Sequence, residues 1–383
     1  MDQNTANSVY QDPWHLEPCR YNPYLFSNNI LDFEMKDIGL RACGGSVVSI
    51  CVRLEDGADT IDRSGFVVDS TLVDGEYSNT ILTSACIVRH NKFADGVALP
   101  SPSDIEITVI FAEGTTCLGE LVGYDFHYSI AALKVRTPMP IPSLRLKKLD
   151  DSISLDPNFI DQPDHPGDRF RLFPGDAVIA LGRYSQGFMI VLGKFSITRT
   201  GFQCENLLRA ECVINTHGIG GPLINRRGEV IGINFFHNDF TPFLPINIVI
   251  LWWENVKKNG YCVIPRHGLK LRNLYVYPPG YLEHVMQTFP NTFTGVVVDK
   301  VKSSTASSTE ILKKDVIIEC DGKPVSSTLE FLELIWDKAG EPVQLTLLRP
   351  HDGSRLHLTI TVANVGLKHL NRWPLPILRT SCR

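Results

Sequence analysis

The chain has 383 residues, of which 43% are apolar and 21% are charged, and its formal net charge is −5. These values are ordinary for a soluble globular protein, and the length allows two domains with separate cores. The acidic balance, without a basic run or a cluster of aromatic and arginine residues, argues against a general nucleic-acid-binding protein.

The first 43 residues are rich in Asn, Tyr, Pro and Phe without clear periodicity, and we predict an N-terminal arm that is partly ordered. The polar, acidic start lacks the features of a secretory signal or a transit peptide. The longest apolar stretch, residues 243–253, is too short to span a bilayer. We therefore expect a cytoplasmic or nuclear protein that does not bind membranes.

From residue 44 onward, short apolar runs alternate with turn residues, which predicts a mainly β fold built as a sandwich or a pair of barrels. The predicted strands lie in GGSVVSICVRL, SGFVVDS, NTILTSACIV, DIEITVIFAEG, TTCLGELVGY, SIAALKV, GDAVIALG, FMIVLGKFSITRTG, AECVIN, GPLINRRGEVIGINFF and FLPINIVI. One helix is expected at 251–260, with lysines in its last turn and a stop at Gly260.

A second pattern, in which strands alternate with helices, begins near residue 262 and predicts a small α+β unit. Its elements are predicted in GLKLRNLYV, PGYLEHVMQTF, TGVVVDKV, STEILKK, DVIIECDGKPV, TLEFLELIWDKAG, VQLTLLRP and RLHLTITVANV. In the last of the helices, Thr328 can cap the start and Gly340 can end it. The tail from residue 364 carries Arg, Pro and Trp and is expected to be a loose terminus.

The ten cysteines are scattered, without a CxxC pair or a Cys/His ligand spacing, so we expect neither a metal site nor a cofactor. Several lie inside apolar runs, where cysteine usually serves as a small buried side chain. Free thiols in a reducing compartment are the simplest interpretation.

Seven motifs, in order, resemble those of the HtrA/Deg protease family. They are SGFVVDS (64–70), NTILTSACIV (79–88), GYDFHYSIAALKV (123–135), FPGDAVIALG (173–182), INTHGIGGPLIN (214–225), RGEVIGIN (227–234) and FLPINIV (243–249). The resemblance implies a chymotrypsin-like double β-barrel followed by a small α+β PDZ domain. It predicts an N-terminal arm at 1–43, the trypsin-like double barrel at 44–258, the PDZ domain at 262–363 and a C-terminal tail at 364–383.

The resemblance also fixes where the catalytic triad should lie. The family's histidine falls on Cys86, its aspartate on Ser129 and its serine on Ile219. A serine-protease triad needs a nucleophile, a base and a carboxylate that orients the base, and none of these stands at its matched position. Loss of one member alone typically lowers turnover by roughly four to six orders of magnitude.

The loop that would hold the oxyanion is altered as well. It comprises His217, Gly218, Gly220 and Gly221. The family has a glycine where this chain has His217, and a side chain restricts the backbone conformations that glycine reaches freely. The resemblance therefore does not guarantee an oxyanion hole, although backbone donors could survive.

Other residues could supply a displaced catalytic group. Cys86 is a possible nucleophile, with His217 or His90 as its base. The simpler interpretation is that Cys86 is a buried apolar thiol, His217 a loop residue bonded to backbone, and His90 an exposed turn residue. Asp125 and His127 could be mistaken for a catalytic pair, but we expect them to be surface loop residues at a strand end.

The PDZ-like unit implies a groove for an extended peptide, which adds to an edge strand while backbone N–H groups hold its terminal carboxylate. The groove residues are predicted to be Gly268, Leu269, Lys270 and Leu271 on the strand side and Leu329, Leu332 and Ile335 on the helix side, with Phe331 beside them. Lys270 could assist carboxylate binding or disturb the turn. The alternative is that these apolar residues form core and the groove is closed.

The family resemblance also suggests trimers formed through N-terminal aromatic residues, here Tyr21, Tyr24, Phe26 and Phe33, which could instead pack on their own barrel. The leading hypothesis is a catalytically inactive HtrA/Deg-like protein in protein quality control. It would bind peptides or unfolded segments, possibly C-terminal peptides, as a scaffold or chaperone-like regulator, alone as a homo-trimer or with active relatives. The alternatives are an active serine- or thiol-type endopeptidase and a purely structural interaction protein.

Overall fold

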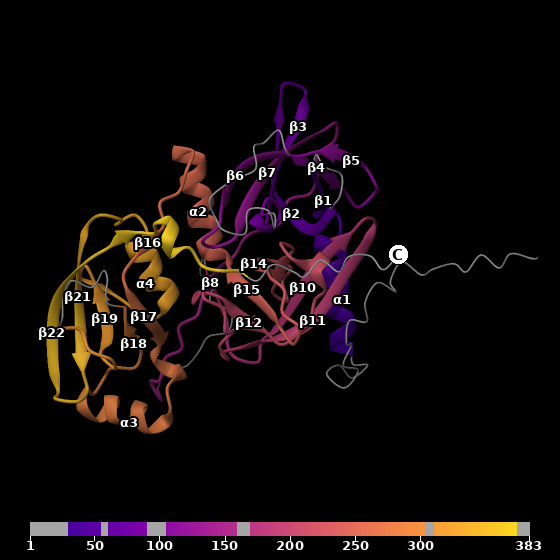
Figure 1. Cartoon of the computed structure of the whole chain (residues 1–383). Helices are drawn as coiled ribbons and strands as arrows, with labels where there is room; N and C mark the ends of the chain where they lie inside the picture. The colour runs from indigo at the N-terminus through magenta and orange to yellow at the C-terminus, as the bar shows by residue number, and fades with distance from the viewer. Residues whose placement is uncertain (1–29, 55–59, 90–104, 159–168, 303–309, 374–383) are drawn as a thin grey trace, which may run out of the picture.

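The computed structural model describes residues 30–54, 60–89, 105–158, 169–302 and 310–373. Two β-barrel units are followed by a smaller unit of strands and helices that lies against the second barrel (Figure 1). Among these residues, no helix combines the length and apolar character needed to cross a membrane.

The first barrel is a seven-stranded antiparallel sheet with the order β5-β4-β1-β2-β3-β7-β6. Its strands are β1 (Val47–Leu54), β2 (Thr60–Val73), β3 (Glu76–Thr83), β4 (Ile105–Ile110), β5 (Thr116–Leu118), β6 (Glu120–Asp125) and β7 (Ile130–Thr137). The sheet curls until β5 contacts β7. Alternating side chains of these strands, including Val48, Ile81 and Leu133, fill the interior, as a period of two residues requires.

The second barrel is a closed, six-stranded sheet with the order β10-β11-β12-β15-β14-β13. Its strands are β10 (Ala177–Tyr184), β11 (Gly187–Ser196), β12 (Leu208–Ala210), β13 (Pro222–Ile224), β14 (Val230–Asn234) and β15 (Thr241–Pro245). The expected strand through AECVIN is wrong beyond Ala210, because residues 211–215 form no strand.

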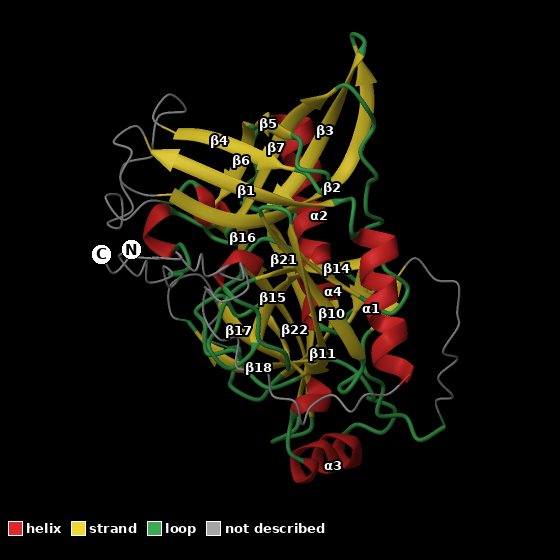
Figure 2. Ribbon diagram, turned by 90° about the vertical axis from the view of Figure 1, so that its right-hand side faces the viewer, coloured by secondary structure: helices red, strands yellow, loops and turns green. Residues whose placement is uncertain are grey.

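A helix that the sequence did not predict, α1 (Ile30–Cys43), covers strands β10 and β11 (Figure 2). It buries Met35 and Cys43. A Cβ atom at Gly39 would lie 3.3 Å from the side chain of Ile190, so the glycine lets the helix approach the sheet. The last part of the predicted arm is therefore a packed element of the second barrel.

Helix α2 (Ile246–Asn259) follows β15 directly. The prediction of a strand through residue 250 is wrong, because the strand ends at Pro245 and the helix starts five residues earlier than expected. The predicted stop is confirmed: Gly260 has a φ of 78°, and its N–H donates to the carbonyl of Val256. A short parallel pair, β8 (Lys148–Asp150) and β9 (Arg169–Arg171), lies beside α2.

The C-terminal unit is a sheet with the order β17-β18-β19-β21-β22, and β20 pairs with β19. Its elements are β17 (Leu269–Asn273), α3 (Pro279–Thr288), β18 (Val296–Val301), β19 (Val316–Cys320), β20 (Lys323–Pro324), α4 (Thr328–Ile335), β21 (Pro342–Arg349) and β22 (Ser354–Thr361). A separate pair, β16 (Pro265–Arg266) with β23 (Ala363–Asn364), joins its two ends. The short helix expected at 308–314 is absent from residues 310–314, where Lys314 has a φ of 78°.

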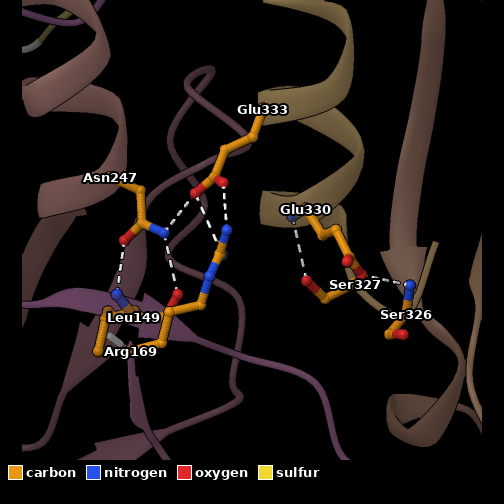
Figure 3. A network of polar contacts seen from close by, with 7 residues as sticks. All are labelled: Leu149, Arg169, Asn247, Ser326, Ser327, Glu330 and Glu333. Carbon is orange, nitrogen blue, oxygen red and sulfur yellow. Dashed lines mark hydrogen bonds and ion pairs between the residues drawn. The ribbon is translucent and has the colours of Figure 1, made fainter. Parts of the chain in front are cut away.

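The N-cap of helix α4 is one residue earlier than the predicted Thr328, and the helix ends before the predicted stop at Gly340. The cap is Ser327, whose Oγ accepts the N–H of Glu330 at 3.2 Å, while the Glu330 carboxylate accepts the N–H of Ser326 at 2.7 Å (Figure 3). This reciprocal arrangement resembles a capping box. The helix ends at Ile335, and Gly340, with a φ of 92°, belongs to a later turn.

A single apolar cluster runs from the second barrel into the C-terminal unit, so the two share a core. Tyr128 of the first barrel stacks on Trp336, which follows α4, with ring centroids 6.1 Å apart. The tail is not loose as far as residue 373: it forms β23 and a 3₁₀ turn at Leu367–His369, and Trp373 is buried. The predicted class, two β-barrels followed by a small α+β unit, is confirmed.

Candidate functional site

The three triad positions come together between the two barrels. Cys86 lies in a 3₁₀ turn (Ala85–Ile87) after β3, Ser129 precedes β7, and Ile219 follows a 3₁₀ turn at Thr216–Gly218. The Ala85 N–H donates to the Ser129 carbonyl at 3.1 Å, and the Ser64 N–H donates to the Ile219 carbonyl at 2.9 Å. The fold therefore assembles the place of the active site, as the resemblance implies.

The side chains at these positions carry no triad chemistry. Ile219 is only 4% exposed and belongs to the shared apolar core. The Ser129 hydroxyl is buried and lies 3.1 Å from the Ser84 hydroxyl. Cys86 is half-buried, with its side chain against the same core. The site is filled by packing and by a hydroxyl pair rather than by a nucleophile and a base.

The backbone amides that would form an oxyanion hole are engaged within their own loop. Asn215 precedes the turn, and its side-chain oxygen accepts the N–H groups of His217 at 3.1 Å and Gly218 at 3.3 Å. The N–H of Ile219 points to the Thr216 carbonyl at 3.4 Å. An oxyanion hole needs donors aimed at the reacting oxygen, so this loop is not arranged to form one.

Asn215 is a functional residue that motif matching did not single out. Asparagine is a favoured cap of a helical turn, and its place before Thr216 was the available signal in the sequence.

The loop around His217 is held rigidly from both sides. The Ser64 hydroxyl donates to the His217 carbonyl at 2.6 Å, and the His217 ring lies against Tyr184 with centroids 4.1 Å apart. Gly220 has a φ of 82°, and a Cβ atom at Gly221 would lie 2.2 Å from the Leu181 carbonyl oxygen. These two glycines allow the tight turn that follows Ile219.

Asp125 ends β6 and His127 lies in the turn that follows, as expected, but both side chains are half-buried rather than exposed. Asp125 accepts the N–H of Tyr128 at 2.6 Å, and burial raises its pKa to about 6. Burial lowers the pKa of His127 to about 4. His90 lies outside the described residues, and the pairing of Cys86 with His217 stays a hypothesis.

The predicted peptide groove is filled by its own side chains. On the strand side Leu269 is buried, and on the helix side Leu329, Leu332 and Ile335 are buried as well. Phe331 meets the His267 ring edge-to-face at 5.3 Å. Gly268 has a φ of 71° and directly precedes β17, in which Lys270 and Leu271 pair with β18.

The first groove amide is also engaged. The Leu269 N–H donates to His267 Nδ1 at 3.3 Å, and burial lowers the pKa of His267 to about 4, helped by the charges of Lys302 and Arg266. A neutral imidazole can accept this hydrogen bond, whereas the protonated ring cannot. The structure therefore agrees with the alternative interpretation, in which the apolar residues of the predicted groove form part of the core.

Lys270 pairs with a carboxylate of the second barrel, and the register of β17 with β18 shifts between Lys270 and Leu271. Its Nζ lies 3.0 Å from Glu205 Oε1, and Lys302 approaches the same oxygen at 3.3 Å. Glu205 belongs to the loop between β11 and β12 of the second barrel, which also contributes the ion pair of Arg199 with Asp299. Ion pairs therefore connect this loop to β17 and β18.

A second set of polar contacts fixes α4 to the second barrel. Glu333 pairs with Arg169 at 2.6 Å and accepts Asn247 Nδ2 at 2.7 Å, and Asn247 Oδ1 accepts the N–H of Leu149 at 2.7 Å (Figure 3). No local pattern predicts this network, because its members are far apart in the chain and glutamate, arginine and asparagine are common surface residues.

A third contact joins the start of α4 to the segment after β8. The buried side chain of Asn273 donates to the Asp151 carboxylate at 2.8 Å and accepts the N–H of Thr328 at 2.7 Å. Burial raises the pKa of Asp151. In the described ranges, with the gaps given above, no group of three or more His, Cys, Asp or Glu side chains is arranged to hold a metal ion.

Comparison with known families gives two matches. A trypsin-like peptidase domain matches residues 63–233, and a PDZ domain matches residues 265–362. The Arabidopsis thaliana protein called Do-like 14 is 28% identical over 319 residues, covering 80% of this chain and 66% of its own length. The serine protease Do-like HtrB of Bacillus subtilis is 26% identical over 298 residues, covering 72% of this chain and 59% of its own length. The chain thus spans about two thirds or less of these relatives.

Among solved structures, the HtrA-type protease AlgW with a tripeptide superposes with a TM-score of 0.55 at 17% identity, covering 86% of this chain and 97% of AlgW. A second AlgW structure with a tripeptide, carrying a substitution, gives 0.52 over similar coverage, 86% and 97%. At this identity the likeness shows the fold.

Proposed function

Because the chain belongs to the HtrA/Deg family, with a trypsin-like domain followed by a PDZ domain, we propose that it is a pseudoprotease that binds peptides or unfolded protein segments. Such a protein would act as a scaffold or chaperone-like regulator rather than as a hydrolase. The single observation that carries the proposal is the buried Ile219 side chain at the nucleophile position.

The state of the surrounding loop supports the same conclusion. Removing one oxyanion donor typically costs about two to three orders of magnitude in kcat, and here the N–H groups of His217 and Ile219 are both engaged within the loop. Rebuilding the triad alone would therefore not restore full activity, because Asn215 would still hold the loop.

A thiol hydrolase that uses Cys86 is the second candidate. A nucleophile and its base must meet at about 3 Å in a defined orientation. The core contact of the Cys86 side chain and the placement of the His217 ring on Tyr184 favour the structural role for both residues. The same assay that tests the main proposal decides between the two.

Assembly and compartment are further parts of the proposal. Phe33 is 74% exposed on α1 and is available for contact with a second copy or an active relative, whereas Tyr21, Tyr24 and Phe26 lie outside the described residues. The eight cysteines that the structure describes are free. A cytoplasmic or nuclear location would keep them reduced.

The test is turnover of unfolded casein by the purified full chain. It is run beside Cys86→Ala and beside the triple variant Cys86→His, Ser129→Asp and Ile219→Ser. We expect no cleavage by the natural chain, together with suppression of aggregation of an unfolded test protein. Cleavage that disappears in Cys86→Ala would contradict the proposal and establish the thiol hydrolase. Inactivity without suppression of aggregation would leave only a structural scaffold.

A further inference from the structure

The tail after β23 leaves the PDZ domain and returns to the trypsin-like domain. In Figure 1 this last yellow segment runs from the region of β16 towards β14. Residues 366–369 are exposed, with Leu367 at 81%, but Trp373 at the end of the segment is only 9% exposed. The exposed residues of the tail are thus followed by one buried aromatic side chain.

Asn371, Arg372 and Trp373 contact the trypsin-like domain. The Trp373 ring lies 4.5 Å from Phe235 and 6.2 Å from Phe202, measured between centroids. The indole N–H of Trp373 donates to the His127 carbonyl at 3.1 Å, and Asn371 Nδ2 donates to the same oxygen at 2.8 Å.

The intervening residue of the tail is held through its main chain. The N–H of Arg372 donates to the side-chain oxygen of Gln203 at 3.0 Å. Short extended peptides are recognised in this way: the protein binds their main chain and buries one aromatic side chain, while the other side chains stay exposed. Tail residues 371–373 therefore sit on the barrel as a peptide ligand does.

The pocket that receives Trp373 adjoins the former active site on two sides. His127 lies two residues before Ser129. Phe235 directly follows Asn234, whose N–H donates to the Gly221 carbonyl at 2.9 Å and whose carbonyl accepts the Gly220 N–H at 2.9 Å. The tail consequently occupies a position beside the degenerate catalytic turn.

The chemistry of the pocket selects an aromatic residue with an N–H group. Phe202 and Phe235 provide apolar walls, and the His127 carbonyl provides a directed acceptor, which suits the amphipathic indole. The second donor to this carbonyl comes from an asparagine two residues earlier. The matching ligand is an extended peptide that contains Asn-x-Trp.

We propose that Phe202, Phe235 and the His127 carbonyl form a peptide-binding pocket for such a segment, and that Trp373 occupies this pocket as an intramolecular ligand. The inference rests on the proposed function, for which it names the binding site and the class of peptide. A tethered ligand has a high effective concentration, so an external peptide competes poorly until the tail is displaced.

The experiment uses the full chain and a fluorescein-labelled, amidated peptide with the sequence of residues 366–373, GLKHLNRW. Binding is followed by fluorescence anisotropy for the natural chain, for Trp373→Ala and for Leu367→Ala, a matched change at an exposed position of the same tail. We expect Trp373→Ala to bind the peptide at least tenfold more tightly than the natural chain or Leu367→Ala does.

Two controls locate the binding. A peptide in which the tryptophan is replaced by alanine should lose at least tenfold in affinity for Trp373→Ala. Adding Phe202→Ala to Trp373→Ala should weaken binding of the intact peptide by a similar factor, with circular dichroism to verify that this doubly changed chain is folded. The half-buried position of Phe202 makes it a milder change than one at Phe235.

Equal affinity of Trp373→Ala and the natural chain would overturn the inference. So would undiminished binding of the alanine peptide, or no binding by Trp373→Ala that circular dichroism shows to be folded. Casein turnover and aggregation of an unfolded protein are measured on the same samples. Cleavage there would refute the pseudoprotease while leaving the pocket standing, and a failed anisotropy result would refute the pocket alone.

Discussion

The region of the matched triad positions and the PDZ groove differ in the kind of chain segment that lies at each. A terminal tail lies beside the matched triad positions, and Asn371, Arg372 and Trp373 attach it there. The PDZ groove is filled by side chains of its own domain and is continuous with the core of the second barrel.

The comparison shows that the two places differ in the free energy needed to open them. A docked terminal segment can leave without unfolding anything else, because local opening costs only the contacts of that segment. Opening the groove would expose core residues such as Leu332 and Ile335, and it would also break the contacts of Glu333 and Asn273 with the barrel. We therefore expect peptides to bind at the proposed Trp373 pocket rather than in the PDZ groove.

The largest expected effect distinguishes the two tryptophans. Trp336 is 1% exposed and stacks on Tyr128 across the domain boundary. We expect Trp336→Ala to lower the free energy of unfolding by about 3–5 kcal/mol. Trp373→Ala should lower it by only about 1.5–2 kcal/mol, because it removes the docking of the tail alone, and a tenfold gain in peptide affinity corresponds to about 1.4 kcal/mol of docking. Urea denaturation of both variants tests this, and equal losses would contradict the distinction.

Acid should weaken the groove through His267. Its folded pKa of about 4 lies below its ordinary value of 6.5, so the unfolded chain binds more protons between these values. The stabilising contribution is complete above pH 6.5 and is lost as pH falls through this window towards 4. The loss is on the order of 3 kcal/mol.

The measurement is the free energy of unfolding from pH 7 to pH 4 for the natural chain and for His267→Gln, whose amide oxygen can still accept the Leu269 N–H. The substituted chain should show a shallower fall. His284→Gln, at an exposed position of α3, is the control and should follow the natural curve. Parallel curves for all three would disprove the role of His267.

A smaller loss is expected from the polar contact between α4 and α2. Glu333→Ala removes the partner of both Arg169 and Asn247. It should lower the free energy of unfolding by about 1.5 kcal/mol and accelerate hydrogen exchange in α4. Glu341→Ala, which breaks an exposed pair with Lys338, should cost well under about 1 kcal/mol. Unchanged exchange in α4 would show that apolar packing alone holds the groove closed.

The smallest effect is expected at Lys270. The ion pair with Glu205 is partly exposed, and Lys302 shares the same carboxylate. Lys270→Ala should therefore change the free energy of unfolding by less than about 1 kcal/mol. It should also leave binding of a C-terminal carboxylate peptide unaltered. A marked loss of such binding would mean that the groove opens in solution and that Lys270 serves it.

The sequence by itself determined the fold and the positions of the missing triad. Strands with a period of two, stops such as Gly260, and the ordered motifs around Cys86, Ser129 and Ile219 are local features, so they can be recognised without knowing what packs against them. The predictions from the sequence were wrong where contacts with distant segments override the local pattern. The apolar run 243–253 forms one strand end and then a helix, and residues 30–43 fold only against β10 and β11.

Tertiary structure decided the state of both binding sites. An apolar face on α4 has the same pattern whether Leu329 and Leu332 line an open groove or fill a core, and only the docked barrel distinguishes the two. The amides of His217 and Ile219 are engaged because the Asn215 loop takes one particular backbone conformation. Trp373 packs against residues that lie more than a hundred positions earlier in the chain. The sequence could not predict this contact, because burial against a distant segment leaves no periodic pattern around the buried residue.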